Sequence, residues 1–276
     1  GALLAPPIFW LAQFLATRGV FSFLSRYDFE TFFHRALLVA AVLLAWPLAR
    51  SIEIRRLSDL QLAPNPNRRR DLLAGILLSA LPLILCGVVL LASPMFSLRA
   101  VINWTAVGRI LLAALFVPLI EEAFFRGLVL GALLKTGRQF LAICLTSILY
   151  SIVHFLKAPE HTSTDVTWTS GFNSIAHAFA QFGDPVLVGA GFTTLFLIGW
   201  ILAEARLLTR SLWLSIGLHA GWIFTAGVFN KIALRQWILL PWMGKNLLVG
   251  IVPLVLACVT WLLLRGWVKY VDARNA

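Results

Sequence analysis

The sequence of 276 residues is poor in charge, since Asp, Glu, Lys and Arg together make up only 13% of it. Soluble domains carry about a quarter of such residues. Here 60% of the residues are hydrophobic, and the mean hydropathy is +0.87. This composition excludes a water-soluble globular domain and predicts a polytopic membrane protein.

Cysteine is equally scarce. The three cysteines, Cys86, Cys144 and Cys258, all fall inside apolar segments and show no paired spacing. A disulfide framework of the kind that staples small secreted domains is therefore excluded. We interpret these thiols as packing residues of the protein interior.

Acidic residues are few, 12 against 23 Lys and Arg, which gives a formal net charge of +11. Such a charge could indicate nucleic acid binding, but the basic residues sit at the ends of apolar segments and form no single stripe. Anchoring at a membrane surface explains this pattern better, so we expect no nucleic acid partner. Most loop Lys and Arg fall on one side of the predicted spans, which places both termini in the cytoplasm.

Long apolar runs are abundant, and a run of about 17 to 25 residues is enough to cross a bilayer. We therefore predict an all-α transmembrane bundle of about eight spans. The first run is interrupted by Pro6, Pro7 and Arg18, so it could instead lie in the membrane interface. The runs centre near Phe14, Val42, Leu83, Glu121, Leu149, Leu195, Ala220 and Leu254.

Two polar stretches divide the chain. Residues 50–70 contain the turn-forming run Pro64, Asn65, Pro66 and Asn67, which is typical of a linker. We predict amino-terminal spans and a cytoplasmic linker in residues 1–70 and a second domain in residues 71–276. Within that domain, residues 157–185 are predicted to form an external loop with a short interfacial helix around residues 175–182.

Charges interrupt the apolar run around residue 121. Glu121 and Glu122 are adjacent, and Arg126 follows one helical turn later. An ionised side chain at the centre of a spanning helix costs roughly 2.5 to 3.5 kcal/mol, so this cluster predicts an intramembrane functional site. Glu122 and Arg126 share one helix face and can pair, whereas Glu121 is rotated by about 100° and is a candidate general base. Alternatively, the cluster only ties helices together.

Two histidines on later spans, His154 and His219, are predicted to lie at a similar depth. Two imidazoles and a carboxylate can hold and deprotonate a water molecule, or alternatively coordinate zinc as a His2Glu site. Two unconnected core histidines are the simpler alternative. The remaining histidines, His34, His161 and His177, fall at a span end or in the external loop and are assigned no role.

Three sequence motifs give a more specific indication of the protein family. The segments EEAFFRG at 121–127, YSIVHF at 150–155 and SLWLSIGLHAGWIF at 211–224 resemble the EExxxR, FxxxH and HxxxN motifs of the CAAX protease and bacteriocin-processing family, type II CAAX prenyl endopeptidase-like. The resemblance covers roughly residues 72–230, in the order of the family.

The resemblance implies roles for individual residues. Glu121 would be the catalytic base that activates water together with His154, while Glu122 and Arg126 would orient the site. His219 would stabilise the oxyanion of the tetrahedral intermediate. Tyr150 would support the site at the position where the family usually has Phe.

One departure from the family pattern affects the chemistry. Ile223 stands four residues after His219, where the family generally has Asn or Asp. An isoleucine cannot donate a hydrogen bond, and loss of one oxyanion donor lowers the rate by about a hundredfold to a thousandfold. Ser215, Trp222 and Tyr150 carry donor hydrogens and are the candidate substitutes.

We therefore expect an intramembrane endopeptidase that hydrolyses a membrane-associated peptide or protein, in contact with membrane lipid, in a bacterial inner membrane. No metal is expected to be required, although zinc at Glu121, His154 and His219 is the alternative. A membrane protein partner is a further candidate. The competing hypotheses are a catalytically weak or inactive scaffold that kept the polar core and an ion-coupled transporter, which would normally show pseudo-symmetric halves.

Overall fold

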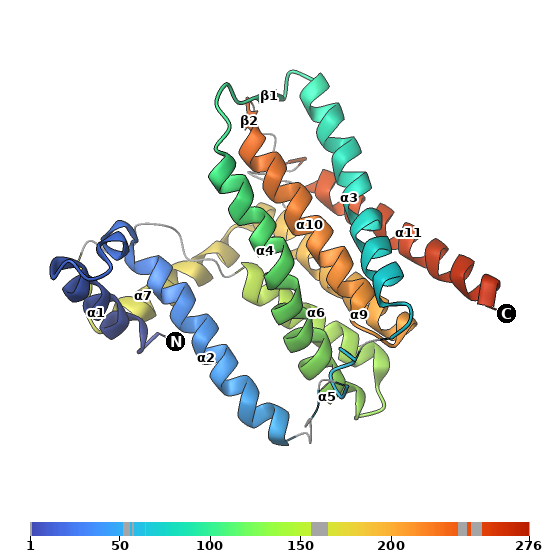
Figure 1. The fold of residues 1–276 in the computed structure, drawn as a ribbon, viewed down its shortest axis with the longest axis horizontal. Helices are drawn as coiled ribbons and strands as arrows, with labels where there is room; N and C mark the ends of the chain where they lie inside the picture. Colours follow the sequence, from blue (N-terminus) through green and yellow to red (C-terminus); the bar gives the residue numbers. More distant parts are fainter. Residues whose placement is uncertain are drawn as a thin grey trace. The chain divides into compact units, whose positions relative to one another are not determined.

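The part of the chain that the computed structural model describes is almost entirely helical (Figure 1). It divides into two compact units, the first formed by residues 1–53 and 153–185 and the second by residues 54–152 and 186–276. The domain boundary near residue 70 stays a prediction. Pro64, His161 and the first residues of the predicted external loop lie outside the described residues, which are 2–51, 56, 58–63, 65–155, 165–236, 242–243 and 250–275.

The first unit is built from short and long helices that pack around aromatic rings. Helix α1 packs against α2, and α7 contacts both. Phe29, Phe33 and Ala178 are buried in their common core. The elements are α1 (Ala5–Thr17), η1 (Ser22–Arg26), α2 (Phe29–Ser51), α7 (Ser170–Ala180) and η3 (Gln181–Gly183).

Helix α1 shows why the first apolar run differs from a full span. Pro6 and Pro7 stand in its first turn, where the missing N–H groups would have no helical partner anyway, so they begin the helix. With 13 residues it is about 20 Å long, shorter than the roughly 30 Å hydrocarbon core. This length favours the interfacial alternative. Helix α7 covers much of the short helix predicted around residues 175–182.

The second unit holds the predicted site and is organised around α10, which lies between α3 and α4 (Figure 1). Strands β1 and β2 pair antiparallel, with Ser97 opposite Leu234, and join the ends of α3 and α10. Helices α9 and α11 pack on one another. The elements are α3 (Arg68–Ala92), β1 (Phe96–Leu98), α4 (Trp104–Glu122), η2 (Ala123–Val129), α5 (Leu130–Leu134), α6 (Gln139–Phe155), α8 (Pro185–Leu187), η4 (Val188–Phe192), α9 (Thr193–Thr209), α10 (Trp213–Ile232), β2 (Ala233–Arg235) and α11 (Ile251–Asn275).

Three helical segments among the described residues are long and apolar enough to cross a membrane: Arg68–Ala92, Val188–Thr209 and Ile251–Arg274. They contain the predicted centres at Leu83, Leu195 and Leu254. These segments support a helical membrane protein, and the other predicted spans stay predictions.

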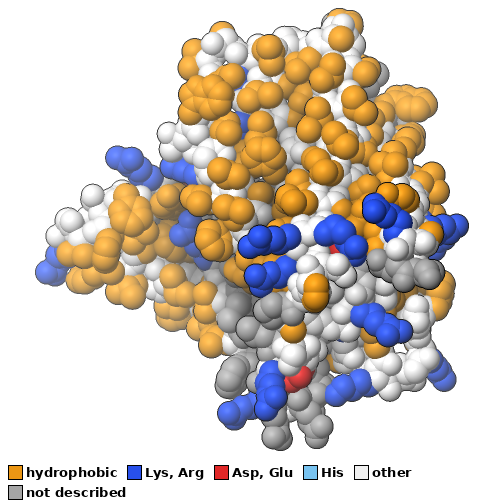
Figure 2. Space-filling view, turned by 45° about the vertical axis from the view of Figure 1, so that its right-hand side comes forward, with side chains coloured by type: hydrophobic (Ala, Val, Ile, Leu, Met, Phe, Trp, Pro, Cys, Tyr) orange, Lys and Arg blue, Asp and Glu red, His pale blue; other side chains and the backbone are white. Residues whose placement is uncertain are grey.

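The surface of the molecule fits this interpretation. Helix α3 exposes a row of large apolar side chains, Leu77, Leu81, Leu85 and Val88. Figure 2 shows a broad apolar surface with Lys and Arg side chains gathered beside it. Large contiguous apolar surfaces are unusual on soluble proteins, and basic side chains beside them are typical of a membrane interface.

Small residues allow α3 and α10 to approach each other closely. A Cβ atom on Gly217 would collide with the carbonyl oxygen of Leu72, and one on Gly221 would collide with the Ser79 hydroxyl. From the other helix, a Cβ on Gly75 would lie 2.5 Å from the Leu214 carbonyl oxygen. Small residues four positions apart on both helices therefore bring the two backbones together, as in other membrane helix pairs.

The variant Gly217→Ala is expected to lower the free energy of unfolding by about 1 to 3 kcal/mol, because the added methyl group meets backbone atoms that cannot turn aside. Denaturant titration of the purified protein in detergent micelles measures this change. The matched control is Gly108→Ala on α4, where an added Cβ meets no atom within 4 Å. Equal stability of both variants would contradict the close packing of α3 and α10.

Candidate active site

The two carboxylates of the first motif lie at a change of helix type. Glu121 and Glu122 are the last residues of α4, and the chain continues directly as the π-helix η2, which carries Arg126. Short π-helical turns inside α-helices are frequent at functional sites. The polar residues thus lie where the regular helical backbone is interrupted.

Glu122 and Arg126 form the predicted ion pair. The Nη1 atom of Arg126 lies 2.9 Å from Oε1 of Glu122, and both side chains are completely buried. Nη2 of Arg126 donates to the backbone carbonyl of Gly199, at 3.1 Å. The guanidinium carbon lies 4.3 Å from the centroid of the Tyr150 ring. Arg126 therefore links its own helix to α9 and α6.

His219 on α10 lies between the two carboxylates. Its Nδ1 is 2.9 Å from Oε1 of Glu122, the same oxygen that accepts from Arg126. Its Nε2 is 3.7 Å from Oε2 of Glu121. Because a carboxylate paired with a guanidinium accepts hydrogen bonds, Nδ1 is the ring nitrogen that carries the hydrogen toward Glu122. Nε2 is then the ring atom on the Glu121 side.

The two carboxylates differ in their access to solvent. The Glu121 side chain is 25% exposed, whereas the Glu122 side chain is fully buried. The buried carboxylate is held by Arg126 and His219, and the partly exposed one lies where water can reach it. This arrangement separates an orienting carboxylate from one that can exchange protons with water.

Tyr150 forms an aromatic wall of the site. Its ring packs edge-on against Phe125, with centroids 5.3 Å apart, and against the His219 ring, at 6.1 Å. A phenylalanine would make the same ring contacts, which explains why Tyr is accommodated here. On the other side, a Cβ on Gly199 would lie only 3.3 Å from Cδ1 of Tyr150. Gly199 is thus a site residue that no sequence motif marks.

His154 follows Tyr150 by one turn on α6, and residues four apart share a helix face. Its side chain is partly buried. His154 belongs to the first unit, whose second segment begins at Val153. Its catalytic role stays a prediction.

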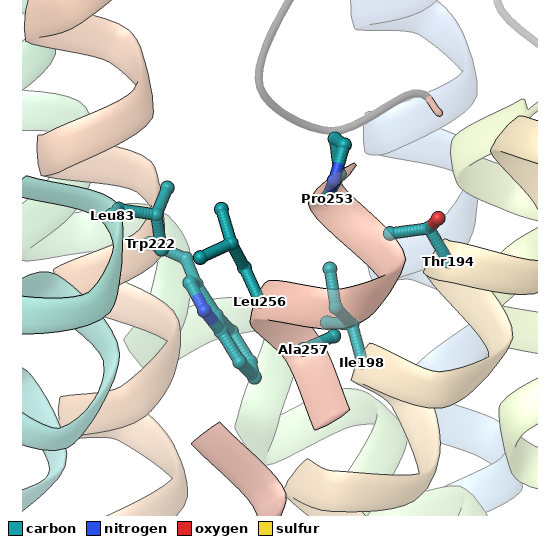
Figure 3. A pocket seen from close by; sticks show the side chains of 7 residues that line it. All are labelled: Leu83, Thr194, Ile198, Trp222, Pro253, Leu256 and Ala257. Carbon is teal, nitrogen blue, oxygen red and sulfur yellow. The ribbon is translucent and has the colours of Figure 1, made fainter. Parts of the chain in front are cut away.

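Ile223 is partly buried on α10, one turn beyond His219. Among the candidate substitute donors, Ser215 already donates its hydroxyl to the carbonyl of Leu212, at 3.0 Å. Trp222 points into an apolar pocket (Figure 3), together with Leu83, Thr194, Ile198, Pro253, Leu256 and Ala257. Tyr150 is the candidate whose ring contacts His219 directly.

The described residues contain no group of three His, Cys, Asp or Glu side chains placed to hold a metal ion. The zinc alternative for Glu121, His154 and His219 stays untested. In the candidate site, Glu122 pairs with Arg126 and with His219.

Comparison with known proteins agrees with the motifs. Residues 103–225 match the family model described as type II CAAX prenyl endopeptidase Rce1-like. No curated protein and no solved structure matches the chain significantly. The matched segment contains all of the predicted site residues and Ile223. Residues 103–225 are therefore similar to type II CAAX prenyl endopeptidase Rce1-like proteins, in agreement with the motifs.

Proposed function

We propose that this protein, like the protease family that residues 103–225 resemble, is an intramembrane endopeptidase in which Glu121 activates a water molecule. The observation that supports this most is the placement of His219 between a buried, ion-paired carboxylate and a partly exposed one. In these two environments, Glu122 can orient His219, while the neighbouring Glu121 can transfer protons.

The proposed reaction begins when the carboxylate of Glu121 takes a proton from water. The resulting hydroxide attacks the carbonyl carbon of the scissile peptide bond, and the carbonyl oxygen becomes an oxyanion. The C–N bond then breaks as Glu121 returns the proton to the leaving amine, so that the acid and the amine are the products. His154 is proposed to help hold the water molecule.

Charge on the oxyanion must be stabilised by nearby donors. We assign this role to His219, whose Nε2 faces Glu121 and must carry a hydrogen in addition to the one on Nδ1 in order to donate, and to the Tyr150 hydroxyl in place of the usual Asn or Asp at position 223. The geometry that supports this choice is the contact of the Tyr150 ring with His219 and Arg126. Arg126 and Glu122 hold His219 in place and take no part in proton transfer.

The substrate class that fits this site is a membrane-associated peptide or protein, approached from within a lipid bilayer. We place the protein in a bacterial inner membrane, with both termini in the cytoplasm and without a nucleic acid partner. The mechanism assigns no step to a metal. A further membrane protein partner is compatible with the proposal.

The test uses water enriched in heavy oxygen. Purified protein in detergent micelles is incubated with solubilised membrane proteins, and new peptide termini are identified by mass spectrometry. Hydrolysis by activated water should place heavy oxygen in each new carboxyl terminus, and addition of a zinc chelator should leave the yield unchanged. A mock preparation from cells that lack the chain removes termini made by other proteases.

A non-catalytic scaffold is the second candidate, because Ile223 removes a donor that the family pattern provides. A scaffold would add no labelled termini above the mock preparation, whatever the incubation time. That outcome would end the protease proposal. Loss of the labelled termini only in the presence of the chelator would show instead that the metal-free mechanism is wrong.

A further inference from the structure

A second buried arginine lies in the site-bearing unit, apart from the candidate active site. Arg206, in the last turn of α9, is only 4% exposed. Its Nε donates to Oε1 of Gln61, at 2.9 Å, and its Nη1 has no hydrogen-bond partner among the described residues. Arg126 faces a carboxylate, whereas no ion pair in the described part of the chain includes Arg206.

Among the described residues, nothing balances the full positive charge of Arg206. A buried charge is strongly destabilising unless it is paired and hydrogen-bonded, and one amide oxygen supplies only a partial negative charge. Because the Nη1 hydrogens meet no acceptor in the part of the chain that the structure describes, this guanidinium is a candidate to bind an anion from outside the chain.

The guanidinium of Arg206 lies close to Gly131. A Cβ atom at that position would lie 3.3 Å from Nη2 of Arg206, so a side chain there would press against the guanidinium. Lys135 follows Gly131 by one helical turn, and Arg210 follows Arg206 by one turn; both are exposed. Both residues stand at a helix C-terminus, Lys135 after α5 and Arg210 after α9, and add positive charge to these ends of the two helices.

The partner of Arg206 on the other side is held rigidly. Gln61 has a left-handed backbone conformation, with φ of 59°, which is strained for a residue with a side chain. The N–H of Leu212 donates to the Gln61 carbonyl, at 3.2 Å, and Asn65 donates to Ser211, at 3.0 Å. This strap, residues 58–63 and 65, fixes Gln61 against Arg206 and so fixes the direction of the guanidinium.

We propose that Arg206 binds a phosphate oxyanion, supplied by the headgroup of an anionic lipid. A planar guanidinium matches two phosphate oxygens at once, which makes arginine well suited to this ligand. Arg206 lies three residues before the end of the candidate span Val188–Thr209, where lipid headgroups meet the protein. This site is separate from the proposed proteolysis and does not depend on it.

Native mass spectrometry of the detergent-purified protein tests the site with phosphatidylglycerol and phosphatidylcholine. The wild type should retain phosphatidylglycerol at least about tenfold better than phosphatidylcholine, and Arg206→Gln should lose this preference, because one charge-assisted hydrogen bond is worth roughly that factor. The control Arg274→Gln removes the same charge from an exposed arginine on α11 and should keep the preference.

Gly131→Leu tests the same site without removing charge, and it serves if Arg206→Gln fails to fold. The larger side chain should displace the guanidinium, which lies close to this position, and abolish the lipid preference. Displacement of the lipid by inorganic phosphate, or tight binding of inorganic phosphate alone, would identify free phosphate as the source of the oxyanion. Equal retention of both lipids by the wild type, without phosphate binding, would overturn the proposal.

Discussion

Replacement of Glu121 by glutamine is expected to lower the rate of peptide hydrolysis by about a hundredfold to ten-thousandfold, the range attributed to general acid–base catalysis. Glutamine has nearly the same shape but cannot take a proton from water at neutral pH. The Glu121 side chain is 25% exposed and is not part of the buried pair of Glu122 and Arg126, so the fold should persist. The rate of appearance of labelled carboxyl termini measures the effect.

The matched control is Glu204→Gln. Glu204 is also a carboxylate of the second unit, but it accepts from Nε1 of Trp261, at 2.6 Å, and from Nε of Arg265, at 2.8 Å. Its loss should weaken the packing of α9 on α11 without removing catalysis. A folded Glu121→Gln protein that cleaves as fast as the wild type would refute water activation by Glu121.

Arg126→Met is expected to lower the free energy of unfolding by about 3 to 5 kcal/mol, the usual effect of removing one partner of a buried ion pair. Among the described residues, the fully buried carboxylate of Glu122 would keep His219 alone as a partner. The substitution also removes the hydrogen bond to the Gly199 carbonyl and the stacking on Tyr150. Denaturant titration in micelles and the yield of folded protein report the change.

A double variant, Glu122→Gln with Arg126→Met, separates the unpaired charge from lost packing. Because it removes both charges, it should recover a large part of the stability that the single variant loses. A single variant as stable as the wild type would show that the ion pair contributes nothing. A double variant no better than the single one would assign the loss to packing and to the Gly199 bond.

The contacts that follow from helix periodicity can be predicted from the sequence. The pairing of Glu122 with Arg126 needs only a spacing of four residues, which the π-helical continuation preserves. The approach of His219 to Glu121 follows the prediction that both lie at a similar depth in their spans. Its shorter contact with Glu122 could not be foreseen, because it depends on how α10 packs in three dimensions.

Contacts made by backbone groups, and close packing between helices, are harder to predict from the sequence. The Gly199 carbonyl that receives Arg126 belongs to an unremarkable apolar run, and any residue type has a carbonyl. Gly217 and Gly221 do stand four apart in the sequence, but this pattern is common in membrane helices and does not name its partner. Only the structure identifies Gly75 and Ser79 of α3 as the facing residues.

Other features of the fold depend on contacts between distant segments. Apolar runs predicted the long helices well, and three of them meet the requirements of a membrane span. Composition could not group residues 153–185 with residues 1–53, because hydropathy says nothing about which segments touch. The short pairing of β1 with β2 likewise joins segments more than a hundred residues apart.

A single oxygen atom, Oε1 of Glu122, serves both Arg126 and His219. The two residues therefore share one acceptor, and neither can be exchanged during evolution without altering what the other experiences. A substitution of Arg126 would leave the Glu122 carboxylate without its cation, so a second substitution at His219 or at Glu122 would be needed to restore the balance of charge. A substitution at any one of these three positions is therefore expected to alter the hydrogen bonds of the other two.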